Sequence, residues 1–280
     1  MNILYISDLD GTLLSNNATL TKRTVRILND LIRQGVLFTV ATARSIASAK
    51  YILEELELTL PIILMNGACI YDPLKKDYIK TETLNSEDAG ILLSMIAKNH
   101  FKGFLYTIEN GNLATYYEEL HNDAMKQFHD ERVNKYNKVF SRTENFSSLI
   151  DKPILYFTLM DNKENLEQLS QMIKELPHIN SVFYKDNYSK DMWYLEIFSK
   201  NTSKYHSVQF LRRYLSVDML IGFGDNQNDM ALFDACDKGY AVENAINELK
   251  LRADGVIGKN TNDAVALWIK QNHKKEHDLY

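Results

Sequence analysis

The first residues that could do chemistry are Asp8 and Asp10, which stand two positions apart directly after the apolar run ILYI. The run predicts a short buried strand, and DG followed by threonine is typical of a turn, so both carboxylates fall where the strand ends. Alternate residues of a strand share a face, so the two side chains converge if the backbone stays extended. Two unpaired carboxylates repel each other unless a cation or a shared reaction gives each a role. The pair is therefore either a reactive or cation-binding site or an Asp-Gly turn that caps the next helix.

The composition of the chain restricts its class. Of 280 residues, 45% are hydrophobic and 25% are charged, which is typical of a soluble globular protein with one large or two ordinary domains. We expect a cytoplasmic location, because no signal-peptide pattern and no membrane-spanning apolar run is visible. Cys69 and Cys236 are too few for a disulfide framework or a zinc cluster. A net charge of -5 argues against a nucleic-acid partner but allows a local basic pocket for an anionic small molecule.

Both ends of the chain alternate between predicted strands and predicted helices. Thr21 is expected to cap a helix with an apolar stripe that ends near Gly35. The further strands are expected at VLFTVATAR, LPIILMNGA, VDMLIGFG and GYAV, with another helix at about 205–215. This order is typical of a parallel sheet with helices on both faces.

The middle of the chain has a different pattern. From about residue 83, the aromatic-rich strand candidates GFLYTI, ILYFTLM and WYLEIF are separated by longer polar stretches, and Asn162 opens an amphipathic helix. We therefore expect an α+β domain with its own core at residues 84–195, inserted into a parallel α/β core formed by residues 1–83 and 196–280.

More polar residues follow other strands of the expected parallel sheet, at the edge where such sheets bind ligands. GDNQND places Asp225, Asn228 and Asp229 after one strand, and Thr42 follows another. Carboxylates from two distant segments indicate a site for a hard cation, and Mg2+ fits because it takes oxygen ligands and bridges to phosphate oxygens. Lys204 falls in the first turn of a helix, an unfavourable place for a cation. It is either a solvated surface lysine or shares an anion with the helix terminus.

Taken in order, DLDGT, ATAR, the SK that ends at Lys204, and GDNQND resemble the four motifs of the haloacid dehalogenase superfamily of phosphohydrolases. The distance between the second and third motifs, with MNGA after the third strand, is similar to that of the Cof-like branch with a subclass IIB cap. The resemblance implies a Rossmann-like core and a cap at 84–195 that sets substrate specificity. One position departs from the pattern, because that branch usually has glycine where Ala43 stands, and a methyl group there narrows the approach of substrate to the backbone.

The resemblance also implies a role for each matching acidic residue. Asp8 would be the nucleophile that forms an aspartyl-phosphate, and Asp10 the general acid and then the general base. Mg2+ would be held by Asp8, the backbone carbonyl of Asp10 and Asp225. Asp229 would belong to the same metal site, where it would orient either Lys204 or a water molecule bound to the metal. Alternatively, it would only be a carboxylate at a helix N-terminus.

The remaining matching residues would bind the substrate. Thr42, Lys204 and Asn228 are expected to contact the phosphoryl oxygens, with Lys204 stabilising charge in the transition state. The resemblance places three further substrate contacts in the crevice: Arg44, Asn66 and Gly67. A separate aromatic group either lines a substrate pocket or belongs to ordinary core: Tyr184, Tyr188, Trp193 and Tyr194.

The predicted function is a magnesium-dependent phosphatase that hydrolyses small phosphomonoesters, such as sugar phosphates or phosphorylated cofactors. A phosphotransferase or phosphomutase, in which a second hydroxyl captures the aspartyl-phosphate, is one alternative. A non-catalytic sensor of phosphorylated metabolites is the other, because a fold alone does not fix function. Neither a nucleic-acid nor a membrane partner is expected, and the sequence does not determine the oligomeric state.

Overall fold

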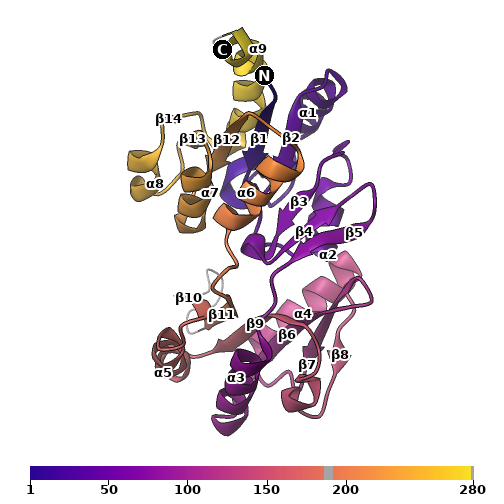
Figure 1. The fold of residues 1–280 in the computed structure, drawn as a ribbon, viewed down its shortest axis with the longest axis vertical. Helices are drawn as coiled ribbons and strands as arrows, with labels where there is room; N and C mark the ends of the chain where they lie inside the picture. The colour runs from indigo at the N-terminus through magenta and orange to yellow at the C-terminus, as the bar shows by residue number, and fades with distance from the viewer. Residues whose placement is uncertain (186–191, 279–280) are drawn as a thin grey trace. The chain divides into compact units, whose positions relative to one another are not determined.

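The computed structural model describes residues 1–185 and 192–278, with side chains through residue 274. The chain forms two compact units: unit 1 consists of Met1–Lys80 and Ser203–Tyr280, and unit 2 of Thr81–Thr202 (Figure 1). These limits differ from the expected boundaries at 83/84 and 195/196, because strand β11 (Trp193–Ser199) runs past the second boundary within unit 2. Tyr188 lies outside the described residues.

Unit 1 is built on a five-stranded sheet with the order β14-β13-β12-β1-β2, in which every neighbouring pair is parallel. Its strands are β1 (Ile3–Ser7), β2 (Leu37–Val40), β12 (Met219–Gly224), β13 (Lys238–Ala241) and β14 (Gly255–Val256). All residues of β1 and β12 are buried. Their nearly continuous apolar sequences reflect this burial on both faces. The parallel sheet predicted from the strand and helix order is confirmed.

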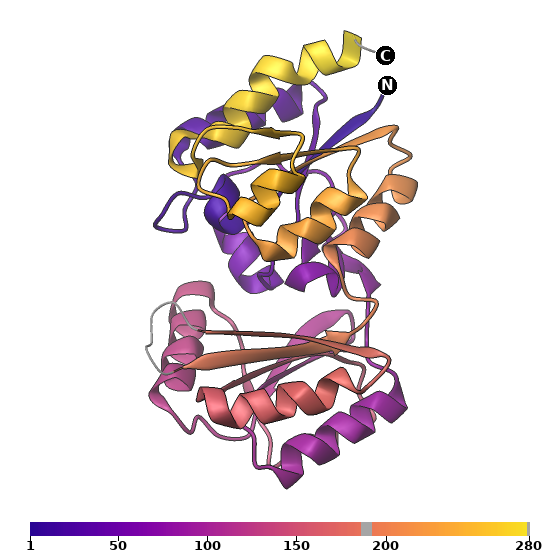
Figure 2. The same ribbon diagram turned by 90° about the vertical axis from the view of Figure 1, so that its left-hand side faces the viewer.

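Helices cover both faces of this sheet. They are α1 (Lys22–Arg33), α6 (Lys204–Tyr214), α7 (Met230–Ala235), α8 (Asn247–Arg252) and α9 (Ala264–Asp278). A further helix of unit 1, α2 (Ile46–Leu53), follows β2 in the chain. α1 packs against α9, and α7 packs against α6 and α8 (Figure 2). The ring of Phe223 in β12 contacts Trp268 of α9, whereas the adjacent Gly222 faces Leu232 and Cys236 at α7. Thr21 caps α1 as predicted, because its hydroxyl accepts from the backbone N–H of Thr24 at 3.0 Å.

The segment LPIILMNGA does not extend the parallel sheet as expected. It contains β3 (Ile62–Leu64), which belongs to a separate three-stranded sheet with β4 (Cys69–Asp72) and β5 (Asp77–Thr81). β3 and β4 are antiparallel, and a single parallel bridge, Ala41 to Ile63, links β3 to the end of β2. Three consecutive residues with positive φ, Met65–Gly67, reverse the chain after β3 and produce the antiparallel pairing.

Unit 2 contains a six-stranded sheet with the order β10-β11-β9-β6-β7-β8. The remaining strands are β6 (Gly103–Glu109), β7 (Asn112–Tyr117), β8 (Ser141–Arg142), β9 (Ile154–Asp161) and β10 (Ile179–Lys185), and the helices are α3 (Ser86–Lys98), α4 (Asp123–Tyr136) and α5 (Lys163–Lys174). α3 and α5 lie on one face of the sheet (Figure 2). Their side chains form a core with that face. On the other face, Phe128 of α4 stacks on Phe104 of β6. The predicted α+β composition is confirmed, and Asn162 caps α5 as expected.

None of the described helices is both long enough and apolar enough to span a bilayer.

Candidate active site

The first motif places a buried carboxylate directly after β1. Asp8 has an extended backbone, is 5% exposed, and donates its N–H to the carbonyl of Phe223 at 2.9 Å. The chain then turns at Gly11, which has a φ of +80° and at which a Cβ would lie 2.3 Å from Asp225 Oδ2. The hydroxyl of Thr12 donates to Asp225 Oδ1 at 2.8 Å. The turn therefore brings the first motif against the fourth.

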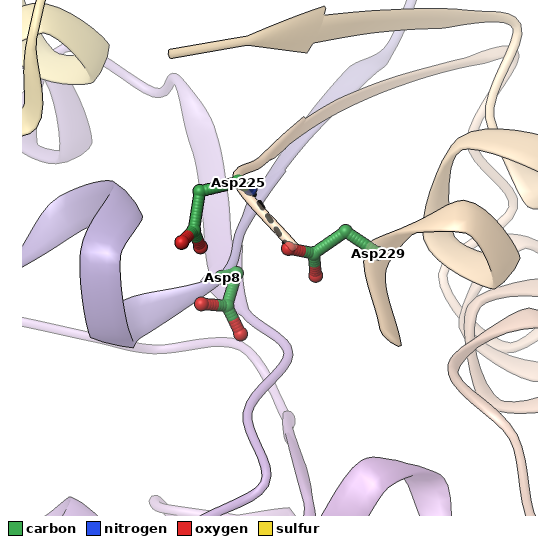
Figure 3. Close-up of side chains that lie close together, drawn as sticks. All are labelled: Asp8, Asp225 and Asp229. Atoms are coloured by element: carbon green, nitrogen blue, oxygen red, sulfur yellow. Dashed lines mark hydrogen bonds between the residues drawn. The ribbon is translucent and has the colours of Figure 1, made fainter. Parts of the chain in front are cut away.

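The fourth motif is held in its turn by Asp229. The Oδ2 atom of Asp229 accepts from the backbone N–H groups of Asp225 at 2.9 Å and Asn226 at 3.0 Å. A Cβ on Gly224 would lie 2.5 Å from the Cβ of Asp229, so the close approach requires glycine. Figure 3 shows the carboxylates of Asp8, Asp225 and Asp229 gathered beyond the ends of β1 and β12. One carboxylate oxygen from each residue lies within 4.8 Å of the others.

Lys204 enters this cluster from the first turn of α6. Its side chain is 1% exposed, and its Nζ lies 2.6 Å from Asp8 Oδ1 and 2.7 Å from Asp229 Oδ1. The alternative of a solvated surface lysine is therefore wrong. The two carboxylates provide the negative charge that an ammonium needs next to the positive end of a helix dipole.

The pKa values reflect this crowding of buried charges. Burial raises the pKa of Asp8 well above its usual value, although the charge of Lys204 acts in the opposite direction. Burial also raises the pKa of Asp225 to about 6; the charge of Asp229 adds to this effect and the hydrogen bond from Thr12 opposes it. Burial alone would lower the pKa of Lys204, but the carboxylates of Asp229 and Asp8 outweigh burial and raise it. The lysine is thus held as a cation among carboxylates that carry more negative charge than it can balance.

The donor set of the cluster fits a hard divalent cation. Among the described residues, nothing donates a hydrogen bond to Asp8 Oδ2 or Asp225 Oδ2, so both oxygens are available as ligands. Both oxygens of Asp229 are already used, one by Lys204 and one by two backbone N–H groups. The geometry therefore favours Asp8 and Asp225 as direct carboxylate ligands, with Asp229 acting through Lys204 and the turn. Oxygen ligands of this kind suit Mg2+.

Asp10 lies apart from the three clustered carboxylates. Its side chain is 49% exposed and pairs with Arg44, whose Nε donates to Oδ2 at 2.7 Å and whose second terminal nitrogen donates to Oδ1 at 2.6 Å. Such a two-point pair fixes the orientation of the carboxylate as well as its charge. Arg44 was expected to contact substrate, and in this structure it holds the predicted acid-base residue.

Three predicted phosphate or substrate contacts form a hydrogen-bonded group. Thr42 is 1% exposed; its Oγ1 accepts from the N–H of Arg44 at 3.1 Å and its carbonyl from the N–H of Asn66 at 3.0 Å. The side-chain amide of Asn228 donates to Asn66 Oδ1 at 3.2 Å. The second motif, the turn after β3 and the fourth motif are thus linked.

Gly67 contributes to the position of Lys204. Its φ is +98°, and a Cβ there would lie 2.2 Å from the carbonyl oxygen of Ser203, the residue that caps α6. The hydroxyl of Ser207 donates to the carbonyl of Gly67 at 3.0 Å. Glycine thus allows the turn after β3 to lie against the start of α6. Ala43, where glycine was expected, is exposed.

The structure also shows supporting residues that had no predicted role. Thr12 stands in the quoted DLDGT motif, so the motif itself could have indicated its contact with Asp225. Asn244 donates to the carbonyl of Gly11 at 2.8 Å from a segment more than 200 positions away. No sequence pattern around Asn244 indicates that contact.

Comparison with known proteins assigns this chain to a family. Residues 5–269 match the family described as haloacid dehalogenase-like hydrolase, and the chain belongs to it. The predicted membership is confirmed, and so is the predicted enzyme class, a phosphoric monoester hydrolase of this family.

Named relatives and solved structures extend over nearly the whole chain. The 5-amino-6-(5-phospho-D-ribitylamino)uracil phosphatase YitU of Bacillus subtilis is 25% identical, with 96% of each chain covered. The pyridoxal phosphate phosphatase YbhA of Escherichia coli is 25% identical, with 94% of this chain and 95% of the relative covered. The fold is that of the subclass IIB sugar phosphatase BT4131, with a TM-score of 0.73, 18% identity, and 97% of this chain and 98% of that chain covered.

Proposed function

We propose that this protein is a magnesium-dependent phosphatase that hydrolyses small phosphomonoesters through an aspartyl-phosphate on Asp8. The observation that carries the proposal is the buried group of Asp8, Lys204, Asp225 and Asp229, in which one oxygen of Asp8 is held by Lys204 and the other is unengaged among the described residues. A carboxylate with one fixed and one available oxygen suits nucleophilic attack on phosphorus.

In the first step, one carboxylate oxygen of Asp8 forms a bond to phosphorus as the bond between phosphorus and the leaving oxygen breaks, and the other would remain for the metal. Lys204 keeps Asp8 oriented and adds positive charge where phosphoryl oxygens accumulate negative charge. Asp10 gives a proton to the leaving alkoxide, which its 49% exposed side chain allows. Bound between Asp8 and Asp225, Mg2+ would reduce the repulsion between the carboxylate and the phosphate.

In the second step, water replaces the alcohol. Asp10, now ionised, takes a proton from the water as its oxygen attacks phosphorus, and the bond to Asp8 breaks. The products are inorganic phosphate and regenerated Asp8. Arg44 has a positioning role, because its two hydrogen bonds orient Asp10, and proton transfer requires that it release at least one carboxylate oxygen.

The substrate class is proposed from the compounds for which two relatives are named. YitU and YbhA are named for phosphate esters of compact ring compounds, 5-amino-6-(5-phospho-D-ribitylamino)uracil and pyridoxal phosphate. We expect a sugar phosphate or a phosphorylated cofactor here, with unit 2 providing specificity as the inserted cap. The cytoplasmic location, the absence of nucleic-acid and membrane partners, and the effect of Ala43 stay predictions.

The decisive experiment measures inorganic phosphate released from a panel of phosphorylated metabolites by chelator-treated protein, with and without added Mg2+. We expect release only with Mg2+ and only from small monoesters. Transfer of phosphate to an added sugar without release would favour the phosphotransferase alternative. Tight metabolite binding without either reaction would favour the sensor. The exposed variant Asp123→Asn, whose side chain is 102% exposed, is the matched control for substitutions in the cluster.

A further inference from the structure

A loop that follows β13 is attached to the fourth motif by its backbone. The N–H of Val242 donates to the carbonyl of Gly224 at 3.2 Å, and the N–H of Ile246 donates to the carbonyl of Asp225 at 2.9 Å. We call residues 242–246 the bracing loop. Because Gly224 ends β12 and Asp225 follows it, the bracing loop has a fixed position relative to the carboxylates of the cluster.

One side chain of the bracing loop reaches the first motif. The amide nitrogen of the Asn244 side chain donates to the carbonyl of Gly11 at 2.8 Å, and its Oδ1 accepts from the N–H of Asn260 at 3.0 Å. Because an N–H donor engages the oxygen, the nitrogen end of the amide must face Gly11. Asn244 is exposed, yet backbone groups hold both ends of its amide. It thus joins the first motif to a loop that is attached to the fourth.

The second partner of this amide is itself held against the turn that carries the first motif. Asn260 is 6% exposed, and its side chain donates to the carbonyl of Leu14 at 2.8 Å. The N–H of Leu14 donates to the carbonyl of Leu9 at 2.9 Å and closes the turn. A buried amide left without partners costs free energy, so Asn260 has little freedom to move. Its backbone N–H therefore gives Asn244 a fixed orientation.

The turn at Gly11 depends on such outside contacts. Within the short helical stretch Leu9–Leu13, Asp10 has a ψ of 121° and Gly11 has a φ of +80°, so neither has a helical backbone. Glycine loses more conformational freedom on ordering than any other residue, which makes a turn at glycine costly to fix. A hydrogen bond to the carbonyl of Gly11 offsets part of this cost. It also fixes the planar peptide unit that joins Gly11 to Thr12.

The orientation of Thr12 in turn affects Asp225. The hydroxyl of Thr12 donates to Asp225 Oδ1 at 2.8 Å, so Oδ2 is the oxygen left for a metal ion. Gly11 lies against that second oxygen, since a Cβ on Gly11 would be 2.3 Å from it. A displacement of the turn would therefore change the direction of both oxygens.

We propose that Asn244 is a positioning residue for the metal site. By holding the carbonyl of Gly11, it fixes the turn that carries Thr12. Thr12 then keeps a free oxygen of Asp225 close to the carboxylate of Asp8, so that one Mg2+ can bind to both. Groups that support metal ligands in this way change metal affinity without contacting the metal. The inference rests on the proposed function only for the metal ion, and the binding of Mg2+ does not require turnover.

The test measures the binding of Mg2+ to chelator-treated full-length protein by titration calorimetry. We expect Asn244→Ala to raise the dissociation constant of Mg2+ by about tenfold, the lower end of the usual loss when a group that supports a metal ligand is removed. Saturating Mg2+ should restore most of the kcat of wild type, because none of the reacting groups is changed. An unchanged dissociation constant would overturn the inference, and so would a loss of kcat that Mg2+ does not restore.

The matched control is Asn247→Ala, which removes another exposed asparagine three positions further along the chain. It should bind Mg2+ as tightly as wild type does, and an equal loss of affinity in both variants would refute the role of Asn244. Urea unfolding of the metal-free variants separates positioning from stability. A lower free energy of unfolding with unchanged Mg2+ affinity would mean that Asn244 supports only the fold. If Asn244→Ala does not fold, Asn244→Ser provides the same comparison, because a hydroxyl cannot replace both ends of the amide.

The design separates this inference from the proposed phosphatase, because calorimetry with Mg2+ needs no substrate. Weaker Mg2+ binding by Asn244→Ala, without phosphate release from any ester by wild type, would leave this inference standing and remove the proposed function. Phosphate release that requires the same concentration of Mg2+ in wild type and in Asn244→Ala would do the reverse. Wild-type protein that binds no Mg2+ would overturn both.

Discussion

Unit 1 and unit 2 each bury a lysine, and the two lysines are compensated in different ways. Lys204 is 1% exposed and lies between Asp8 and Asp229, whereas Lys138 is 8% exposed and lies against the rings of Tyr106 and Phe140. Burial opposes the charged form in both places. The pKa of Lys204 is nevertheless raised and that of Lys138 is lowered to about 7.

The difference shows that the partners of a buried lysine decide what it can do. Carboxylates keep Lys204 permanently charged, which suits a residue that stabilises a phosphoryl group. Aromatic rings offset less of the desolvation, so Lys138 is near the midpoint of its titration at neutral pH. A permanent charge suits catalysis, whereas Lys138 can lose its proton near neutral pH.

Removing the nucleophile should give the largest effect. We expect Asp8→Asn to lower kcat by at least about a thousandfold, because the amide cannot form the aspartyl-phosphate. The variant should unfold at the same temperature as wild type or a higher one, because burial raises the pKa of Asp8 and its charged form costs stability. Phosphate release and thermal unfolding measure the two effects. Wild-type turnover in Asp8→Asn would rule out the mechanism, and Asp123→Asn should behave as wild type.

Substituting Lys204 measures how much the stability of the buried cluster depends on its positive charge. Lys204→Met leaves Asp8 and Asp229 buried without their cation, so the free energy of unfolding should fall by about 3–5 kcal/mol at pH 7. Urea unfolding measures the loss. The exposed Lys22 offers the control Lys22→Met, which should change stability by less than about 0.5 kcal/mol. Equal stability of the Lys204→Met variant and wild type would mean that the cluster does not need the lysine.

Asp10 is paired with a cation, as Asp8 is, but its side chain is half exposed. Asp10→Asn should lower kcat at least about a hundredfold, because it removes the proton donor and acceptor. Its stability should change little, since an exposed ion pair contributes about 0.2–1 kcal/mol. Steady-state kinetics and the trapping of phosphorylated protein measure the effect. The control is Asp30→Asn, which removes another exposed aspartate that pairs with an arginine, Arg33. An unchanged kcat would exclude Asp10 as the acid-base residue.

The smallest effect concerns the pH dependence of stability at Lys138. Its pKa is about 7 in the folded protein and 10.5 in an ordinary lysine, so between these values the folded state binds fewer protons than the unfolded state. The free energy of unfolding of wild type should therefore rise, relative to Lys138→Met, by about 2 kcal/mol from pH 7 to pH 9. Urea unfolding at the two pH values measures this rise. The matched control is Lys135→Met, which removes an exposed lysine of α4. The free energy of unfolding of Lys135→Met should differ from that of wild type by the same amount at both pH values. If the difference between wild type and Lys138→Met were also the same at both pH values, Lys138 would be charged throughout this range.

Much of the fold followed from local patterns. Thr21 and Asn162 were predicted as helix caps because an N-cap depends on a few adjacent residues. The strands of the parallel sheet were predicted from their apolar runs, but β3 was assigned to the wrong sheet. The pairing of β3 depends on a turn with positive φ at Met65–Gly67, which an apolar run does not reveal. Unit 2 extends past the expected boundary near residue 195 for a similar reason, because pairing with β9 and β10 keeps β11 in unit 2.

The amino-acid sequence by itself determined the family and the residues of its four motifs, since these depend on residue types in a fixed order. Only the tertiary structure decided how those residues are used. Asp229 is committed to Lys204 and the turn, and Arg44 holds Asp10. Desolvation and pairing depend on which distant segments come together, so the charge state of a buried group is a property of the fold and not of its neighbours in the chain.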